Sequence, residues 1–325
     1  MSTVMHFGWI PPAVRTKEMD ELHEMVTSTM MVPFFLSGPP GTSYKDEKGR
    51  FALWQIAERA NGGNRLHYIH QYTGSCVGAG AGNALTTAAL VEIDLGDAEE
   101  WPSDGAFWLY PYGQSRRIAG LNGPGEGSFG SAYAKAIMEC GIFTRSEEES
   151  VPRLYVDSEG WLVAGVTTQK AAATEREWSD GAAWNREPYT SAGKKHLIGS
   201  MASIKTVEAA KAAIQNGYPL TIASSFGTRT IRPKNGVNIA EWDDTWYHQM
   251  FIDEAWDHPQ EGLLFRIGNN WGSKAHPAPT QGEPAGGFYI TDNTLSRILA
   301  DRGTECYAMS RFAGFQLRTL VWGPF

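Results

Sequence analysis

The order of local patterns along the chain constrains the fold of this 325-residue protein more than any other feature. Apolar and small residues recur at helical spacing over 77–95 and 128–140, and a glycine closes each run. The last third instead alternates as strands do, in WYHQMFIDEAW, LLFRIG, GGFYIT and FQLRTLVW. Helices followed by strands predict an α+β protein with a helical half and a β half that pack against each other.

Composition and charge narrow the class of protein. Hydrophobic residues make up 42% of the chain, which is enough for a sizeable core. The formal net charge of -8 opposes binding to nucleic acid, because phosphate contacts require clustered Lys and Arg. Residues 1–25 lack a basic start and a sustained apolar run, so we expect neither a signal peptide nor a membrane anchor. Three cysteines are too few for a disulfide framework and favour a reducing compartment such as the cytoplasm.

The chain divides into an arm and one large domain. Residues 1–66 combine a short acidic helix candidate with Gly-Pro punctuation, and we interpret them as an N-terminal arm. The domain then spans 67–325, with a helical half over 67–145 and a β half over 196–325. Between the halves, residues 146–195 are charged and aperiodic, which predicts a surface insertion.

The stretch GSC places a thiol at the start of a predicted helix. Unpaired backbone N–H groups and the helix dipole stabilise a thiolate at such a position. Cys76 has this position, whereas Cys140 lies on the apolar face of the helix predicted over 128–140. Cys76 is therefore the candidate nucleophile.

A thiol nucleophile needs a base and a group that orients the base. His248 stands near the start of a half-buried strand pattern, where a cleft can reach it. Asn269 opens NNWG directly after the apolar strand LLFRIG, so a short hairpin brings its amide beside the imidazole. These two residues are the candidate base and orienter.

Four motifs in the same order resemble the papain-like cysteine peptidases: GSC opening a helix, the histidine of YHQMFIDEAWD, NNWG and GGFYI. The resemblance implies that Cys76 attacks the substrate, that His248 relays the proton and that Asn269 orients His248. It also implies that Trp271 shields the His248–Asn269 hydrogen bond from water. The fold that the resemblance implies is papain-like α+β, with the nucleophile helix at the N-terminus of the helical half and this half packed against an antiparallel β-sheet or barrel half.

The segment GPGEGSFGSAYAKAIMECGI resembles the glycine-rich substrate-binding loop of the same family and the helix that follows it. The resemblance extends over residues 66–290. It implies a set of substrate-binding positions around the cleft: Gly74, Ser75, Gly123, Gly125, Gly127 and Tyr247.

The sequence departs from the family at two places. The family carries a glutamine six residues before the cysteine as an oxyanion donor, and that position is His70 here, while Gln71 lies five residues before Cys76. We favour Gln71 as the donor, with His70 as the alternative. The second departure is the proline-rich segment SKAHPAPTQGEPAGG after NNWG, which we expect to reshape one wall of the cleft.

Neither a metal nor a cofactor is expected. The remaining histidines lack the spacing of a tetrahedral metal site, and we interpret them as surface or loop residues: His67, His70, His258 and His276. GAGAGN lacks the Lys-Ser/Thr ending of a phosphate-binding loop and is expected to permit close helix packing instead.

The expected function is hydrolysis of amide bonds in a peptide or protein substrate, without nucleic-acid or membrane partners. One rival is a papain-fold assembly protein, for example a phage virion component among other subunits, with an idle or single-use site. Its location would then be the virion. The other rival is a cell-wall peptidase of the NlpC/P60 type, which usually orients its histidine with another histidine or polar residue, and NNWG argues against it.

Overall fold

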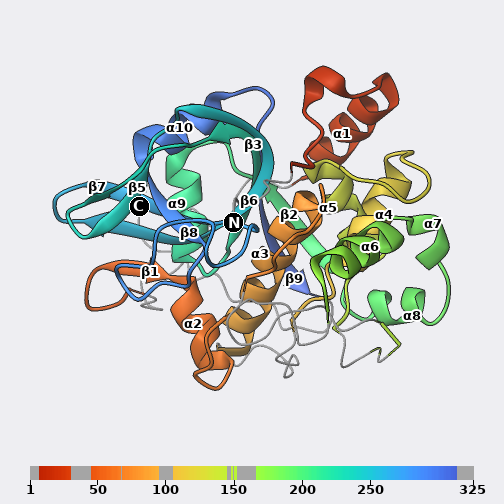
Figure 1. The fold of residues 1–325 in the computed structure, drawn as a ribbon, viewed down its shortest axis with the longest axis horizontal. Helices are drawn as coiled ribbons and strands as arrows, with labels where there is room; N and C mark the ends of the chain where they lie inside the picture. The colour runs from red at the N-terminus through yellow and green to blue at the C-terminus, as the bar shows by residue number, and fades with distance from the viewer. Residues whose placement is uncertain are drawn as a thin grey trace.

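A computed structural model describes residues 7–30, 45–66, 68–94, 105–144, 148, 150–151 and 166–312 (Figure 1). In the described part of the chain the helices are α1 (Lys17–Thr29), α2 (Leu53–Ala60), α3 (Cys76–Asp94), α4 (Leu109–Ile118), α5 (Gly130–Glu139), α6 (Thr168–Trp178), α7 (Gly181–Trp184), α8 (Tyr189–Lys194), α9 (Val207–Gln215), α10 (Asp292–Ala300) and the 3-10 turn Pro12–Val14. The strands are β1 (Arg50–Ala52), β2 (Ile198–Ser203), β3 (Leu220–Gly227), β4 (Ile231–Lys234), β5 (Val237–Ala240), β6 (Asp244–His258), β7 (Gly262–Gly268), β8 (Gly287–Thr291) and β9 (Glu305–Phe312). The α+β class is confirmed, and most helices precede the strands, although β1 precedes α2 and the helices α9 and α10 lie among the later strands.

The strands form one sheet with the order β2-β9-β3-β6-β7-β8-β5-β4, and β1 pairs with β6. Neighbouring strands are antiparallel except β5 and β8, which are parallel, so the predicted antiparallel half is a mixed sheet. The long strand β6 lies between β3 and β7, with His248 opposite Ser224. Strand β6 is therefore held on both sides where it carries the candidate base.

Helix α3 lies between the sheet and the helical part that contains α4–α8 (Figure 1). Its glycines allow close contacts on several sides. A Cβ atom added to Gly80 would lie 2.9 Å from the Gln249 carbonyl oxygen, and one added to Gly82 would lie 2.6 Å from Cβ of Trp108. The packing role expected for GAGAGN is confirmed. By length and composition α3 could cross a membrane, but 89% of its apolar window is buried inside the protein.

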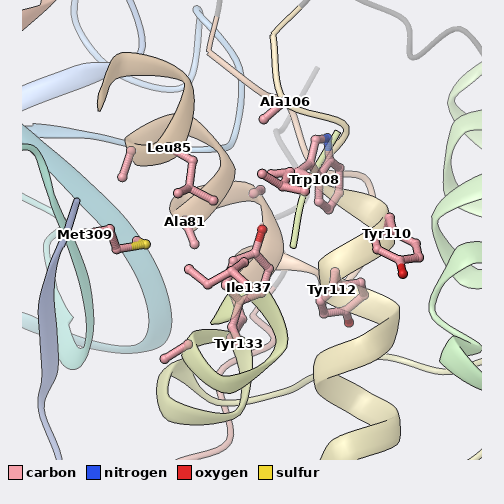
Figure 2. Packing of buried hydrophobic residues seen from close by; sticks show 14 of the residues in the cluster. Ala81, Leu85, Ala106, Trp108, Tyr110, Tyr112, Tyr133, Ile137 and Met309 are labelled. Carbon is pink, nitrogen blue, oxygen red and sulfur yellow. The ribbon is translucent and has the colours of Figure 1, made fainter. Parts of the chain in front are cut away.

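Aromatic side chains fill the core of the helical half around α3. Figure 2 shows Trp108 and Tyr112 of the α4 region beside Ala81 and Leu85 of α3, with Tyr133 of α5 nearby. A second apolar cluster lies in the β half, where α9 and α10 cover the sheet. Helix α3 contributes to both clusters and joins the two halves.

The C-terminal end of the predicted arm packs against the rest of the protein. Strand β1 pairs with β6, and α2 packs against α3 with Leu53 and Trp54 buried. Trp54 Nε1 donates a hydrogen bond of 2.6 Å to the buried Glu254. Residues 50–60 thus belong to the core, because their short apolar run provides a buried helix face. Helix α1, predicted within this region, lies against α5.

The structure describes part of the segment 146–195, which was predicted to be a surface insertion. Residues 168–194 form α6, α7 and α8, and α6 and α7 pack against α4. Ala171, Glu175 and Trp178 are buried on one face of α6, and Trp178 stacks on Trp184 at 3.9 Å. The described part of this segment is therefore mainly helical, and it supports α4 from the side of α6 and α7. The strand expected at 315–322 and most of the acidic run at 146–150 lie outside the described residues.

Candidate active site

The candidate nucleophile opens helix α3. The Cys76 side chain is fully buried, and the backbone N–H of Gln249 donates to its Sγ atom at 3.4 Å. Burial raises the pKa of the Cys76 thiol to about 12, although backbone N–H groups of Gln249, Gly8 and Trp9 favour the thiolate. In this form Cys76 is a neutral thiol.

His248 lies on β6 directly before the residue that contacts the thiol. Its Nε2 donates to Asn269 Oδ1 at 2.7 Å, and the Trp271 ring stacks on the imidazole with centroids 4.5 Å apart and an interplanar angle of 24°. The structure therefore brings together the three residues that the resemblance places around the base. Nδ1 is buried and makes no hydrogen bond within the described residues. Burial lowers the pKa of His248 to about 3, against the hydrogen bond to Asn269.

Asn269 is itself held by a residue that the sequence did not single out. Its Nδ2 lies 2.8 Å from His276 Nε2, so the amide donates and the imidazole accepts. This contact directs Oδ1 toward His248 and sets the tautomers of both histidines. Burial lowers the pKa of His276 to about 4, which keeps it a neutral acceptor.

His276 lies in a loop, as expected, but its contact with Asn269 was not predicted. His258 is neither a surface nor a loop residue, because it is buried at the end of β6. The one sequence feature that could have indicated a role for His276 was its position in the long SKAHPAPTQGEPAGG segment. His70 stacks on Tyr72 with centroids 4.3 Å apart, and His67 lies outside the described residues.

The loop before Cys76 contains the predicted oxyanion donor. Gln71 is buried, its backbone N–H donates to the Asn270 carbonyl at 2.9 Å, and its Nε2 donates to the Thr73 carbonyl at 2.8 Å. Gln71 is therefore fixed in the loop before Cys76, with its side-chain amide directed to a carbonyl of the same loop.

A buried carboxylate from α6 holds the same loop. Glu175 accepts hydrogen bonds from the Tyr72 backbone N–H at 2.8 Å, from Thr73 Oγ1 at 2.7 Å and from Ser75 Oγ at 2.9 Å. Burial raises the pKa of Glu175 to about 7, although these hydrogen bonds oppose the rise. Sequence reasoning missed Glu175, and its only signal was an acid on the apolar face of a short helix.

The glycine-rich loop is tied to the nucleophile loop. The Gly127 N–H donates to the Gly74 carbonyl at 2.9 Å, and the Gly74 N–H donates to Glu126 Oε2 at 2.9 Å. The Gly125 N–H donates to Ser179 Oγ at 2.8 Å. Four predicted substrate-binding positions are thus engaged in hydrogen bonds within the protein in this form: Gly74, Ser75, Gly125 and Gly127.

Arg116 stabilises the glycine-rich loop through hydrogen bonds to its backbone carbonyl groups. Its guanidinium donates to the carbonyl oxygens of Glu126 at 2.7 Å and Gly127 at 2.6 Å, and reaches that of Gly123 at 3.5 Å. A buried arginine with several carbonyl partners fixes the path of a loop that has little side-chain packing of its own. Gly123 adopts φ of 75°, which favours glycine.

Residues 7–15, the cleft segment, lie between this loop and β6. The Ser128 N–H donates to the Gly8 carbonyl at 2.9 Å, and the Ile10 N–H donates to the Ser128 carbonyl at 2.8 Å, as in a parallel β-bridge. The Trp9 N–H donates to the carbonyl of the predicted substrate-binding residue Tyr247 at 3.3 Å. The cleft segment therefore covers Cys76 and explains its burial.

The fit of the cleft segment is tight. A Cβ atom added to Gly8 would lie 1.8 Å from the Gly74 carbonyl oxygen, so only glycine is accommodated there. The Phe7 ring lies edge-on to Trp271 at 5.7 Å and to His248 at 6.3 Å. The cleft segment thus contacts the loop before Cys76, the glycine-rich loop and Trp271, which lies on the His248 ring.

The described ranges contain no cluster of three His, Cys, Asp or Glu residues that could hold a metal ion. All three cysteines in these ranges are free thiols. The groups gathered here are suited to thiol and proton chemistry.

No protein-family model matches the sequence. No curated protein matches it either. Among solved structures, the chain is similar to xylellain, a cysteine protease from Xylella fastidiosa, with 14% identity, a TM-score of 0.51 and coverage of 94% of this chain and 91% of that chain. It is also similar to proCathepsin B S9 from Trypanosoma congolense, with 11% identity, a TM-score of 0.50 and coverage of 94% and 87%. At these identities the likeness shows the fold, which is the papain-like α+β fold.

Proposed function

We propose that this protein is a cysteine peptidase-like hydrolase that cleaves amide bonds in peptides or proteins. The observation that carries the proposal is the 2.7 Å contact between His248 Nε2 and Asn269 Oδ1 beneath Trp271, on the strand whose next residue donates to the Cys76 thiol. A nucleophile, a base and an orienter in this relation are the parts that acyl transfer needs. The fold shared with cysteine proteases supports the same class of chemistry.

In the proposed reaction the cleft segment first leaves and water enters the site. His248 then takes the proton of Cys76, and the thiolate attacks the carbonyl carbon of the substrate. The backbone N–H of Cys76 and Nε2 of Gln71, released from the Thr73 carbonyl, stabilise the oxyanion. His248 gives the proton to the leaving amine, and a water molecule activated by His248 hydrolyses the thioester to free Cys76.

The closed form, in which residues 7–15 cover Cys76, is also compatible with the rival assembly function. Burial keeps the Cys76 thiol and the His248 imidazole neutral while residues 7–15 cover the site, and an assembly protein with an idle site would keep it covered. The cell-wall peptidase alternative is less suited, because the base contacts an asparagine directly and His276 lies behind that asparagine. The choice is therefore between a hydrolase that opens and a fold that stays closed.

The substitution Gly8→Val separates these two possibilities, because a side chain at Gly8 cannot coexist with the Gly74 carbonyl. We expect the full-length variant to react with an active-site-directed epoxide at Cys76 about tenfold or more faster than the wild type, and to cleave a quenched fluorescent peptide mixture. Val14→Ser, at a residue 67% exposed on the same segment, is the matched control. Labelling of opened Cys76 no faster than an ordinary thiol, without peptide cleavage, would identify an idle site.

A further inference from the structure

The C-terminal part of α6 contacts both loops that border the candidate nucleophile. Glu175 accepts three hydrogen bonds from the loop before Cys76. The next residue, Arg176, donates from Nη2 at 2.8 Å and from Nε at 3.0 Å to Glu126 Oε1, and Glu126 belongs to the glycine-rich loop. Helix α6 therefore holds both loops through two adjacent side chains.

These two contacts differ in exposure. The side chains of Arg176 and Glu126 are 51% and 40% exposed, so solvent weakens their ion pair. Glu175 is fully buried, and within the described residues its hydrogen-bond donors all come from residues 72–75. Hydrogen bonds to a buried carboxylate are stronger than those between neutral groups. Glu175 is therefore the stronger constraint on the loop.

The contact with Ser75 bears on the backbone N–H of Cys76. The peptide unit between these two residues is planar and trans, so the Cys76 N–H points away from the Ser75 carbonyl. The Ala79 N–H donates to that carbonyl at 3.1 Å, and the Ser75 hydroxyl donates to Glu175 at 2.9 Å. These two hydrogen bonds set the direction of the Cys76 N–H.

The second candidate oxyanion donor, Gln71, depends on the same carboxylate. The backbone N–H of Tyr72, the next residue, donates to Glu175 Oε1 at 2.8 Å. Gln71 Nε2 donates to the carbonyl of Thr73, and the Thr73 hydroxyl donates to Glu175 Oε2 at 2.7 Å. The backbone that carries Gln71 is thus held at the two residues that follow it.

We propose that Glu175 is a positioning residue for oxyanion stabilisation. It holds the loop so that the backbone N–H of Cys76 and the amide of Gln71 can reach the carbonyl oxygen that gains charge during acyl transfer. The inference rests on the proposed function, because it assigns a role in the same reaction. Loss of the carboxylate should slow the steps that form the oxyanion, since donors must be placed accurately to act.

Steady-state kinetics in the Gly8→Val background test this role. Glu175→Ala should lower kcat for peptide cleavage by about tenfold to a hundredfold, with a change in KM of less than about threefold. Glu175→Gln should recover most of kcat, because its amide oxygen can accept from the Tyr72 N–H and its NH2 group can donate to the two hydroxyls. Glu177→Ala, on the exposed side of the same helix, is the matched control and should leave kcat unchanged.

Alkylation of Cys76 by iodoacetamide separates positioning of the oxyanion donors from general damage to the site. In alkylation the sulfur displaces iodide and no carbonyl oxygen gains charge, so the rate should stay within about twofold in Glu175→Ala. A normal kcat in Glu175→Ala, an alkylation rate that falls as much as kcat, or a Glu175→Gln protein as slow as Glu175→Ala would overturn the proposal.

Hydrogen exchange followed by mass spectrometry tests the loop without catalysis. In the otherwise wild-type chain, Glu175→Ala should exchange the N–H groups of residues 72–75 about tenfold or more faster than Glu177→Ala does, and Glu175→Gln should not. Unchanged exchange in Glu175→Ala would also overturn the proposal. Failure of the Gly8→Val protein to cleave peptides would count against the proposed hydrolase, and the exchange rates would then decide the role of Glu175.

A second variant serves if circular dichroism shows that Glu175→Ala is unfolded. Thr73→Val removes one hydroxyl contact and keeps the shape of the side chain, and Thr73→Ser keeps the hydroxyl as its control. Thr73→Val should lower kcat by about fivefold, with unchanged alkylation of Cys76, because one hydrogen bond to the carboxylate is lost. A normal kcat in Thr73→Val, or an equal fall in Thr73→Ser, would contradict positioning by Glu175.

Discussion

At the scale of single residues, the three thiols of this protein differ in what surrounds them. Cys76 opens a helix beside the strand of His248, whereas Cys306 is buried within β9 and Cys140 lies beside Arg117 and Gln114. We expect Cys76→Ser to abolish both epoxide labelling and peptide cleavage in the Gly8→Val background, because only this thiol has a base nearby. Peptide mapping of the labelled protein locates the modified residue.

Cys140→Ser and Cys306→Ser are the controls, and both should retain labelling at Cys76. A folded Cys140→Ser protein that is as inactive as Cys76→Ser would show that the nucleophile is assigned to the wrong residue.

In the proposed mechanism Asn269 orients the base and takes no part in bond making. In the Gly8→Val background, Asn269→Ala should lower kcat by about tenfold to a thousandfold, and less than His248→Ala does, since proton transfer contributes in this range. KM should change little, because Asn269 lies behind the imidazole. Steady-state kinetics measure both constants, with Asn293→Ala on the exposed start of α10 as the control. A normal kcat in Asn269→Ala would refute the orienting role.

His276 contacts Asn269, so any effect of His276 on the base His248 is indirect. His276→Ala should lower kcat by about fivefold, which corresponds to the loss of one ordinary hydrogen bond to Asn269 Nδ2. His276→Gln retains an acceptor and should recover most of the loss, whereas a merely structural effect would lower thermal stability without recovery of kcat by Gln. Paired kcat and melting measurements on the two variants distinguish these outcomes.

The residues of the candidate site were predictable from sequence to unequal degrees. Cys76, His248, Asn269 and Trp271 stand in short motifs whose order along the chain fixes the identification, and their local neighbours predict their elements. Glu175 and His276 act through contacts with residues that are remote in sequence, so no local spacing indicates them. Gln71 was placed in the correct loop, but its hydrogen bond to Thr73 depends on the closed form.

At the scale of elements, α6 stabilises the loop of the nucleophile through Glu175. The folded-state pKa of about 7 lies above the ordinary value of 4.5, so between these values the folded state retains a proton that the unfolded state has released. Stability from this group is therefore complete below the lower value and is lost as the pH rises through the upper one. The full effect is about 3 kcal/mol by the linkage between pKa and free energy.

Glu175→Gln removes this titration. The difference in melting temperature between the wild type and the variant should therefore shift in favour of the variant between about pH 5 and about pH 8. Glu177→Gln on the exposed side of the same helix is the matched control. A difference that stays constant with pH would mean that Glu175 is ionised throughout the range.

The elements themselves were predictable where the pattern was long. Helix α3, α5, α9 and the strands β6, β7 and β8 follow from periodicity, because each buries a continuous face. Strand β1 with α2, and the helices α6–α8, were missed because short charged segments become helical only when a neighbour buries their few apolar residues, as α4 does for Trp178 of α6. Tertiary packing, not local propensity, decided these segments.

At the scale of the whole molecule, the cleft segment controls access of water to the pair Cys76 and His248. In the wild type, alkylation of Cys76 by iodoacetamide should be slow near neutral pH and should rise toward alkaline pH, because burial raises the thiol pKa to about 12. In Gly8→Val the rise should begin at lower pH, since hydration lowers the desolvation cost of the thiolate. The test is the alkylation rate of Cys76 measured across pH in the wild type and in Gly8→Val, with Val14→Ser as the matched variant. Identical pH profiles for the wild type and Gly8→Val would show that the cleft segment does not limit access to Cys76.

The pairing of residues 8–10 with Ser128 has a consequence for how the protein responds to concentration. The segment and the cleft belong to one chain, so the segment competes at an effective local concentration, on the order of millimolar for short flexible connections, that dilution does not change. A free peptide at micromolar concentration is outcompeted unless it binds far more tightly than the segment does. We therefore expect a substrate alone to open the cleft poorly. Removal or displacement of residues 7–15 would open it to the same extent at any protein concentration.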